Sequence, residues 1–333
     1  MTDMAALVAE GVAADPTSRL RLARIPIPEP KRGEVLVKMH AAPCNPADIL
    51  YLEGRYGIDR PLPATPGFEG SGEVIATGGG ILGRWLVGKR VAVGGHDCSG
   101  TWAEYCVAPA TACLPLAKDL TLDQGAAALA NPVTALCLVD LAKRGRHRAI
   151  VQTAAAGQLG KMIAVAAQDR GIPAIHIVRR ADQADALRAI GAQHVLVSTE
   201  PEFARNLAVK AAALGATIAF DAVAGELTGR VLEALPPRSE VVVYGALSGD
   251  ACAAIDPMTL AFGHKQVRGF EVAGYLKDIG LLRAFRLARK AQDRVRSGAF
   301  ATTIADRVPL AEAPARLGGY VARMSDGKIL LAA

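Results

Sequence analysis

The fold is decided by residues 148–180, which read RAIVQTAAAGQLGKMIAVAAQDRGIPAIHIVRR. A β-branched apolar run at residues 149–151 leads into a loop of small residues, and an apolar helical stretch follows to about residue 170. After a Gly-Ile-Pro turn, a second apolar run covers residues 174–178. This order predicts one βαβ unit, with the pattern A-x-G-x-x-G between its first strand and its helix.

The small residues of this loop have a chemical consequence. Without bulky side chains, the backbone can approach a pyrophosphate, which then sits on free N–H groups at the helix N-terminus. We therefore expect a dinucleotide site made by five loop residues: Ala155, Gly157, Gln158, Leu159 and Gly160. Ordinary tight packing between a strand and a helix is the alternative interpretation of the same pattern.

The residues after the second predicted strand select the kind of dinucleotide. A carboxylate about 20 residues beyond the loop binds the ribose 2′-hydroxyl of NAD, but this chain has Arg179 and Arg180 in that region. Because guanidinium groups pair with phosphate bidentately, the sequence predicts NADP(H) as the cofactor. The alternative is that both arginines are solvated at a strand end.

The composition indicates a compact chain with two domains. Its 333 residues are 51% hydrophobic and 21% charged, which suits two cores and argues against a disordered chain. The net charge is +6, but the Lys and Arg residues are dispersed. Nucleic acid is therefore not an expected partner, whereas an anionic cofactor or substrate is.

Cysteine usage and the N-terminal residues favour a cytoplasmic protein. The six cysteines form no C-x-x-C pair and the six histidines show no metal-ligand spacing, so no metal site is expected. Residues 1–16 lack a basic segment followed by an apolar core, and no uncharged apolar run is long enough to span a bilayer. We expect free, mostly buried thiols in a reducing compartment.

Two patterns along the chain predict its domains. Short strands separated by Gly and Pro, typical of a partly open barrel, are expected at residues 34–39, 72–76, 90–93 and 102–107. Beyond about residue 120, helices alternate with strands, which predicts a parallel doubly wound sheet. Its later helices are expected at residues 182–190, 201–214 and 226–235, and its strands at residues 194–197, 217–223 and 240–244. A basic amphipathic helix at residues 279–298 precedes strand-like pieces that we expect to return to the first domain.

Four segments carry a resemblance to a known family: Asn45-Pro46-Ala47-Asp48, GFEGSGEV at residues 67–74, NPVTA at residues 131–135 and YGALSG at residues 244–249. With the barrel, the dinucleotide loop and the C-terminal return, the chain resembles the medium-chain dehydrogenase/reductase superfamily over nearly its whole length. The resemblance implies a GroES-like substrate domain, at residues 1–118 and 265–333, and a Rossmann NADP(H)-binding domain at residues 119–264.

Within that superfamily, the chain is most similar to the zinc-free branch. Zinc-dependent alcohol dehydrogenases place a Cys where this chain has Asn45 and a His where it has Phe68. An asparagine is a poor zinc ligand beside thiolate, and Phe68 cannot ligate a metal. A zinc-type alcohol dehydrogenase is therefore the weaker alternative.

The zinc-free branch contains quinone oxidoreductases and 2-enoyl thioester reductases. The resemblance implies hydride transfer from NADPH to a quinone or to the conjugated C=C of an α,β-unsaturated carbonyl or enoyl thioester. Phe270 and Glu271 match the substrate pocket, where many enoyl reductases carry a Trp in place of Glu271. A carboxylate beside an acyl pocket has to be solvated or paired, so the choice between the two acceptors stays open.

The resemblance also assigns roles to single residues. Tyr56 matches the proton-donating tyrosine of the enoyl reductases, and a loop tyrosine at the barrel rim is the alternative. Asn45 either donates its amide to a substrate or ribose oxygen or caps a helix that starts at Pro46. Asp48 and Glu69 are expected to be structural, through hydrogen bonds to backbone N–H groups.

Further positions are implied as cofactor contacts. Asn131 and Thr134 match residues that approach the nicotinamide and its phosphate, although Thr134 could equally be a buried N-cap. The same role is implied for Tyr244, Gly245, Ala246 and Leu247, which follow a predicted strand. Lys328 matches a lysine that contacts NADPH phosphates, and a solvated surface lysine is the alternative. His176 is expected to be a satisfied core residue.

Two expectations concern partners. Relatives dimerise through the last Rossmann strand, and residues 240–244 are an apolar edge candidate whose pairing would remove an exposed edge. We therefore expect a homodimer that acts on a small-molecule acceptor. A non-enzymatic NADPH-binding structural or RNA-associated member of the superfamily is the alternative, distinguished by absent turnover and a salt-steep RNA affinity.

Overall fold

The computed structural model describes residues 3–58, 60–321, 324 and 327–333, which form two compact units. The β-rich unit contains residues 1–132 and 288–333, and the parallel-sheet unit contains residues 133–287. Both predicted boundaries, at 118/119 and 264/265, therefore differ from the compact units. The second differs because residues 266–269 form a strand that extends the parallel sheet.

The parallel-sheet unit is the parallel doubly wound sheet that the alternating sequence pattern predicted. Six parallel strands are arranged as β10-β9-β8-β11-β12-β13, which is the doubly wound order 3-2-1-4-5-6. The strands are β8 (Ala149–Gln152), β9 (Ala174–Val178), β10 (His194–Val197), β11 (Ala216–Asp221), β12 (Glu240–Val243) and β13 (Gln266–Gly269). The order reverses between β8 and β11, where such sheets bind ligands at their carboxyl ends.

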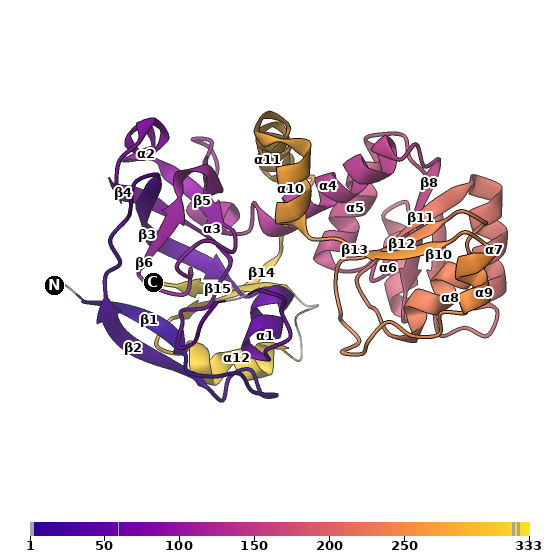
Figure 1. Cartoon of the computed structure of the whole chain (residues 1–333), viewed down its shortest axis with the longest axis horizontal. Helices are drawn as coiled ribbons and strands as arrows, with labels where there is room; N and C mark the ends of the chain where they lie inside the picture. The colour runs from indigo at the N-terminus through magenta and orange to yellow at the C-terminus, as the bar shows by residue number, and fades with distance from the viewer. Residues whose placement is uncertain (1–2, 59, 322–323, 325–326) are drawn as a thin grey trace. The chain divides into compact units, whose positions relative to one another are not determined.

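Helices follow each strand of this sheet (Figure 1). They are α5 (Gln158–Gln168), α6 (Ala181–Ala189), α7 (Phe203–Leu214), α8 (Glu226–Ala234), α9 (Pro257–Ala261) and α10 (Val272–Ile279). Helix α4 (Ala130–Arg144) precedes β8, and α11 (Leu281–Arg296) follows α10. Two fully buried aromatic residues, Phe203 of α7 and Phe220 of β11, help fill the core. Burial of apolar side chains from α7 and α8 against the strands is the main stabilising contribution here.

The sequence predicted that residues 240–244 form the edge strand of this sheet, and this prediction is wrong. Strand β12 lies inside the sheet, because β13 pairs with it in parallel from Gln266 to Gly269. The short strand β13 is therefore the edge. Its sequence, QVRG, contains one apolar side chain, so hydrophobic patterning alone gave no sign of it.

The β-rich unit contains a seven-stranded sheet in the order β14-β15-β3-β4-β5-β7, with β6 on β3, and a separate hairpin of β1 and β2. Its strands are β1 (Asp3–Ala9), β2 (Leu20–Pro26), β3 (Glu34–Pro43), β4 (Glu69–Thr77), β5 (Arg90–Gly94), β6 (Tyr105–Pro109), β7 (Cys113–Pro115), β14 (Ile304–Pro309) and β15 (Lys328–Ala332). Its short helices are α1 (Pro46–Leu52), α2 (Ile81–Leu86), η1 (Ala110–Ala112), α3 (Leu122–Ala126) and α12 (Ala313–Val321).

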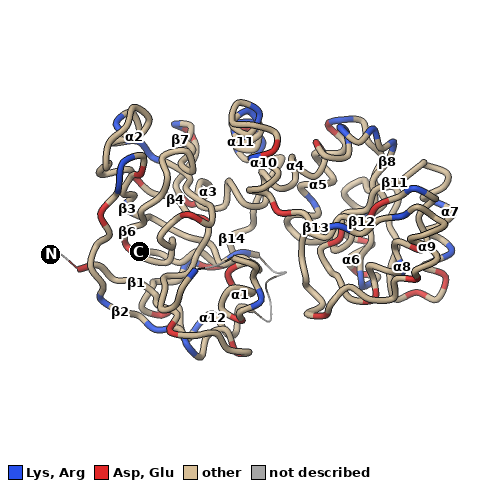
Figure 2. The backbone as a smooth tube through the Cα atoms, in the orientation of Figure 1, with Lys and Arg blue, Asp and Glu red and all other residues tan. Residues whose placement is uncertain are grey.

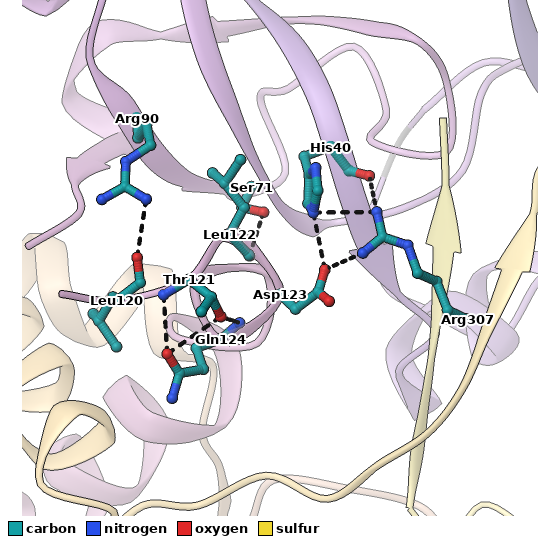
Figure 3. A network of polar contacts seen from close by, with 9 residues as sticks. All are labelled: His40, Ser71, Arg90, Leu120, Thr121, Leu122, Asp123, Gln124 and Arg307. Atoms are coloured by element: carbon teal, nitrogen blue, oxygen red, sulfur yellow. Dashed lines mark hydrogen bonds and ion pairs between the residues drawn. The ribbon is translucent and has the colours of Figure 1, made fainter. Parts of the chain in front are cut away.

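The predicted C-terminal return is confirmed. Strand β15 pairs antiparallel with β3, so that Leu330 lies opposite Pro43 and Ala332 opposite Ala41; Figure 1 shows the yellow strand beside the indigo one. Side chains also fasten β14 to this unit (Figure 3). Arg307 donates to Asp123 of α3 at 2.5 Å, and the same carboxylate lies 3.0 Å from His40 of β3.

Charges are dispersed over both units, with blue and red segments interspersed along the tube in Figure 2. Among the residues that the structure describes, no helix is both long and apolar enough to cross a membrane.

Candidate functional site

The small-residue loop forms a bare helix N-terminus. Gly157 is the N-cap of α5 and carries no side chain that could accept from the N–H groups of the first turn. These groups have no intrahelical partner, so they are available to an anion. The preceding turn places Ala154 at φ 49°, a left-handed conformation that is uncommon for alanine.

Gly160 explains why this loop needs small residues. A Cβ built on Gly160 would lie 2.6 Å from the carbonyl oxygen of Ala155 and 2.7 Å from that of Ala154. The helix therefore lies directly on the strand–loop turn, and Ala155 is completely buried. This close approach fits the third small position of a pyrophosphate-binding turn, so the residues present suit a dinucleotide.

The two arginines after β9 differ in their surroundings. Arg180 occupies the N-cap position of α6, and its guanidinium pairs bidentately with Asp182, at 3.0 and 3.1 Å. This pairing lowers the pKa of the Asp182 carboxyl. Arg179 is exposed, and its side chain makes no hydrogen bond or ion pair with the described part of the chain. Arg179 is thus the more available of the two cations.

Sequence reasoning missed a buried network at the point where the strand order reverses. Asp221 ends β11 and is fully buried. Its carboxylate accepts hydrogen bonds from the hydroxyls of Thr153 and Thr228, at 2.8 and 2.7 Å, and from the N–H of Val223 at 2.9 Å. The network fixes the loops after β8 and β11. The sequence did contain a signal for this network, because Asp221 is a carboxylate at the end of an otherwise apolar strand.

The predicted segment after β12 turns back over this network. Tyr244 and Leu247 donate their N–H groups to the carbonyls of Asp221 and Ala222, at 2.9 and 3.0 Å. Gly245 and Ala246 are half-buried between them, whereas Leu247 is 59% exposed. The four residues therefore lie at the carboxyl end of the sheet, and their role as cofactor contacts stays a prediction.

Glu271 has a structural role that the sequence did not reveal. It is the N-cap of α10, and its carboxylate accepts from the N–H groups of Ala273 and Gly274 at 2.7 and 2.6 Å. The neighbouring Phe270 ring packs on Tyr275 with centroids 5.5 Å apart. The carboxylate is therefore exposed and hydrogen-bonded, so it does not have to be accommodated inside an apolar pocket.

In the β-rich unit, Tyr56 belongs to an aromatic cluster rather than to an isolated rim position. Its hydroxyl lies 3.1 Å from Nε2 of His96. Its ring packs on Phe68 with centroids 5.3 Å apart, and Phe68 lies 5.7 Å from the His96 ring. We call Tyr51, Tyr56, Arg60, Phe68 and His96 the aromatic cluster.

Arg60 holds the cluster together. Its guanidinium lies 4.8 Å from the Phe68 centroid and 5.8 Å from that of Tyr51. The same group donates to the carbonyls of Thr65, His96 and Cys98 at 2.9 to 3.0 Å. Neither Arg60 nor His96 was predicted, because nothing in their spacing along the chain marks them as a pair.

Asn45 occupies the N-cap position of α1, one of its two predicted roles, but its side chain makes no hydrogen bond to the first turn of the helix. Its side chain is 5% exposed and both ends of the amide are engaged. The nitrogen donates to Glu69 at 3.1 Å, and the oxygen accepts from the ammonium group of Lys328. One N–H of the amide remains for a substrate or cofactor oxygen.

Lys328 is buried, with 5% of its surface exposed, so its alternative role as a solvated surface lysine is wrong. Asp48 and Glu69 bind backbone N–H groups as expected. Asp48 accepts from Asn45 and Phe68 at 2.7 and 3.1 Å, and burial raises the pKa of Asp48 to about 7.

Glu69 connects this cluster to α4. Its second oxygen accepts from the N–H groups of Leu129 and Ala130 at 2.8 and 2.7 Å. Asn131 is the second residue of α4 and is half-buried. Thr134 lies four residues inside the helix, so its alternative role as an N-cap is wrong.

The remaining polar predictions concern the core and metals. His176 is 6% exposed and satisfied by Gln152 at 2.8 Å, as predicted. Burial, with a smaller contribution from His194, lowers the pKa of His176 to about 4. Among the described residues, no three His, Cys, Asp or Glu side chains lie together as a metal site would need.

Comparisons with known proteins agree with this arrangement. Residues 31–118 match the family described as alcohol dehydrogenase GroES-like domain, and residues 159–282 match the family described as zinc-binding dehydrogenase.

Individual relatives cover more of the chain. A mitochondrial enoyl-[acyl-carrier-protein] reductase of Arabidopsis thaliana is 30% identical over 270 residues, which are 78% of this chain and 70% of that protein. The crystal structure of a presumed NADPH:quinone reductase from Mesorhizobium loti is 34% identical, with a TM-score of 0.91, and covers 100% of this chain and 99% of that one. A mycobacterial protein solved in complex with NADPH is 27% identical, with a TM-score of 0.83, and covers 99% of this chain and 100% of that one.

Proposed function

Because this chain belongs to the quinone oxidoreductase and enoyl reductase-like branch of the medium-chain dehydrogenase/reductase superfamily and is an NADPH-dependent oxidoreductase, we propose that it reduces a conjugated acceptor without zinc. The acceptor is a quinone or the C=C of an α,β-unsaturated carbonyl or enoyl thioester. The observation that carries this proposal is the Tyr56 hydroxyl, held 3.1 Å from His96 inside the aromatic cluster.

Each part of the reaction has a group in this chain. NADPH supplies a hydride, and the loop residues 155–160 with Arg179 and Arg180 would hold its phosphates. Hydride addition to a conjugated system places negative charge on the carbonyl oxygen, which needs a hydrogen-bond donor or a proton. Tyr56 would provide it. Asn131, Thr134, residues 244–247 and Lys328 are the further proposed cofactor contacts, and Phe270 and Glu271 would flank the acceptor.

Zinc independence rests on the identity of two side chains. Phe68 cannot ligate a metal, and its ring is instead packed against Tyr56 and His96. The amide of Asn45 is already engaged by Glu69 and Lys328. Dialysis against a chelator should therefore leave turnover unchanged, and loss of turnover that added zinc restores would refute this part of the proposal.

The experiment that tests the proposal measures NADPH oxidation with a soluble quinone and with a short 2-enoyl-CoA, in parallel. Tyr56→Phe should lower kcat by about 100-fold or more if the phenol is the proton donor. Tyr51→Phe is the matched control, because the buried Tyr51 hydroxyl has no hydrogen-bond partner among the described residues. Equal rates for both variants and the wild type would remove Tyr56 from the chemistry.

The same assay separates the two acceptors. Faster turnover of the enoyl thioester would assign the chain to the enoyl reductases, which the capped position of Glu271 permits. Faster turnover of the quinone would assign the chain to the quinone oxidoreductases. No turnover of either would refute the proposed acceptor class.

Two finer proposals concern assembly and location. We propose a homodimer in which the edge strand β13 pairs with its copy, because unpaired edges associate readily. Sedimentation should give twice the 34.6 kDa chain mass. We also propose a reducing compartment such as the cytoplasm, because all six cysteines are free.

A further inference from the structure

We propose that His96 is a proton relay that reprotonates Tyr56 from solvent after each turnover. This inference rests on the proposed function, since it assumes that Tyr56 gives up a proton. It adds a residue that neither the sequence pattern nor the family resemblance singled out. The geometry that carries it is the contact between the Tyr56 hydroxyl and Nε2 of His96, at 3.1 Å.

A phenol that donates its proton needs to recover one. In the proposed step, the O–H bond of Tyr56 breaks and its proton joins the acceptor, which has also received the hydride. The phenolate then takes the proton from Nε2 of His96, and the imidazole takes a proton from water at Nδ1. This transfer leaves His96 as the other neutral tautomer, protonated at Nδ1. Loss of that proton to water and uptake of one at Nε2 restore the starting tautomer, so that the net result is one solvent proton and one hydride added to the acceptor.

His96 is placed for both halves of this exchange. Its Nε2 faces Tyr56, while the residue is only half-buried and its Nδ1 has no hydrogen-bond partner within the described part of the chain. Imidazole is the side chain that both takes and gives protons near neutral pH. Tyr56, which is also only partly buried, therefore has a neighbour that can link it to water through two distinct nitrogens.

The loop that carries His96 is fixed from two sides. The carbonyl of His96 accepts from Arg60 at 3.0 Å, and the N–H of Gly95 donates to the carbonyl of Phe68 at 2.9 Å. Phe68 packs on both the Tyr56 and His96 rings. Two charged groups adjoin His96: the Arg60 guanidinium, through its bond to the His96 carbonyl, and the exposed Asp97, which is the next residue in sequence. The structure therefore holds donor and relay together without relying on the acceptor to align them.

The test is chemical rescue of His96→Ala. Its kcat should fall by about 100-fold, while the Kd for NADPH, measured by the cofactor's fluorescence, should stay within about twofold. Added imidazole should restore most of the lost kcat without changing KM, because the free base replaces the missing relay. The double variant with Tyr56→Phe should not respond to imidazole. A structural role for His96 would not give this pattern.

A second variant controls for misfolding of His96→Ala. His96→Gln keeps a side-chain amide near Tyr56 but cannot pass a proton, so it should have the wild-type melting temperature and the low kcat of the alanine variant. Wild-type kcat in His96→Gln, or a failure of imidazole to restore His96→Ala, would overturn the relay.

These outcomes are distinct from failure of the proposed function. If Tyr56→Phe turns over like the wild type, the donor assignment fails and the relay fails with it. If Tyr56→Phe is slow and both His96 variants are fast, the relay alone is wrong.

Discussion

Replacing Glu69 by glutamine should destabilise the β-rich unit, although the side chain keeps its size. Glu69 is 1% exposed and accepts three hydrogen bonds, from the N–H groups of Leu129 and Ala130 and from the amide of Asn45. An amide has one acceptor oxygen in place of two. If that oxygen faces α4, the new NH₂ group faces the NH₂ group of Asn45.

No rotation of the neighbouring amide removes this conflict. Turning Asn45 over would direct its NH₂ group at the ammonium of Lys328, which at present donates to the Asn45 oxygen. One buried donor is therefore left without an acceptor in every arrangement, at a cost of about 1–3 kcal/mol. Losing the negative charge at the N-terminus of α4 adds up to about 1 kcal/mol. We expect a total loss of about 2–4 kcal/mol.

Tryptophan fluorescence during urea unfolding measures this loss of stability in the β-rich unit, to which Glu69 belongs. The chain has two tryptophans, at positions 85 and 102, and both belong to the β-rich unit. Trp102 is fully buried and donates to the carbonyl of Pro43, two residues from Asn45. With a slope of about 1–3 kcal/mol per molar urea, the midpoint should fall by roughly 1 M.

Glu73→Gln is the matched control, because Glu73 lies on the same strand and is exposed. Its midpoint should stay close to that of the wild type. If Glu69→Gln shifted the midpoint no more than Glu73→Gln does, the reasoning from buried donors would be refuted.

Three further predictions concern the parallel-sheet unit. Arg179→Ala should raise the KM for NADPH about tenfold or more and leave the KM for NADH unchanged. Arg180→Ala should raise the KM for NADPH less, because Asp182 already pairs with Arg180. An equal rise in KM for both cofactors would contradict the assignment. Gly160→Ala forces a Cβ to within 2.6 Å of a carbonyl oxygen, so calorimetry should show weaker NADPH binding. The pKa of His176 is lowered to about 4 from 6.5, so the unfolded chain binds its proton more readily. The stability contributed by neutral His176 is therefore present above about pH 6.5 and lost as the pH falls toward 4. On acidification from pH 7 to 4.5, the free energy of unfolding of His176→Gln should fall by about 2–3 kcal/mol less than that of the wild type. Urea unfolding at each pH measures this difference.

The parts of the fold that depend on neighbours along the chain were predictable. In the βαβ unit, β9 has its predicted bounds at residues 174–178, β8 ends at residue 152 in place of 151, and α5 ends at residue 168 in place of about 170. Its signal is local, since apolar periodicity and small loop residues both act within a few positions. The start of α1 at Pro46 was one of the two alternatives for Asn45 for the same reason, because Asn-Pro at a helix start is a signal carried by adjacent residues.

The contacts that were missed join residues far apart in sequence. Tyr56 and His96 are separated by 40 positions, and Asn45 and Lys328 by 283. Their proximity follows from the pairing of β15 with β3 and from the loop after β5, which no local pattern encodes. Strand β13 was missed because its pairing with β12, rather than its own hydrophobicity, makes it a strand.

The position of β15 between β14 and β3 also sets an order for folding during translation. Residues 133–287 form one continuous segment that a ribosome completes before the chain reaches β15. The parallel-sheet unit can therefore fold on the nascent chain, whereas β3 remains without its β15 neighbour until residues 328–332 emerge. In this interval the first strands depend on β4 and β6 alone, and the buried oxygen of Asn45 still lacks Lys328. Chaperones that bind exposed strands would have their main opportunity during that delay.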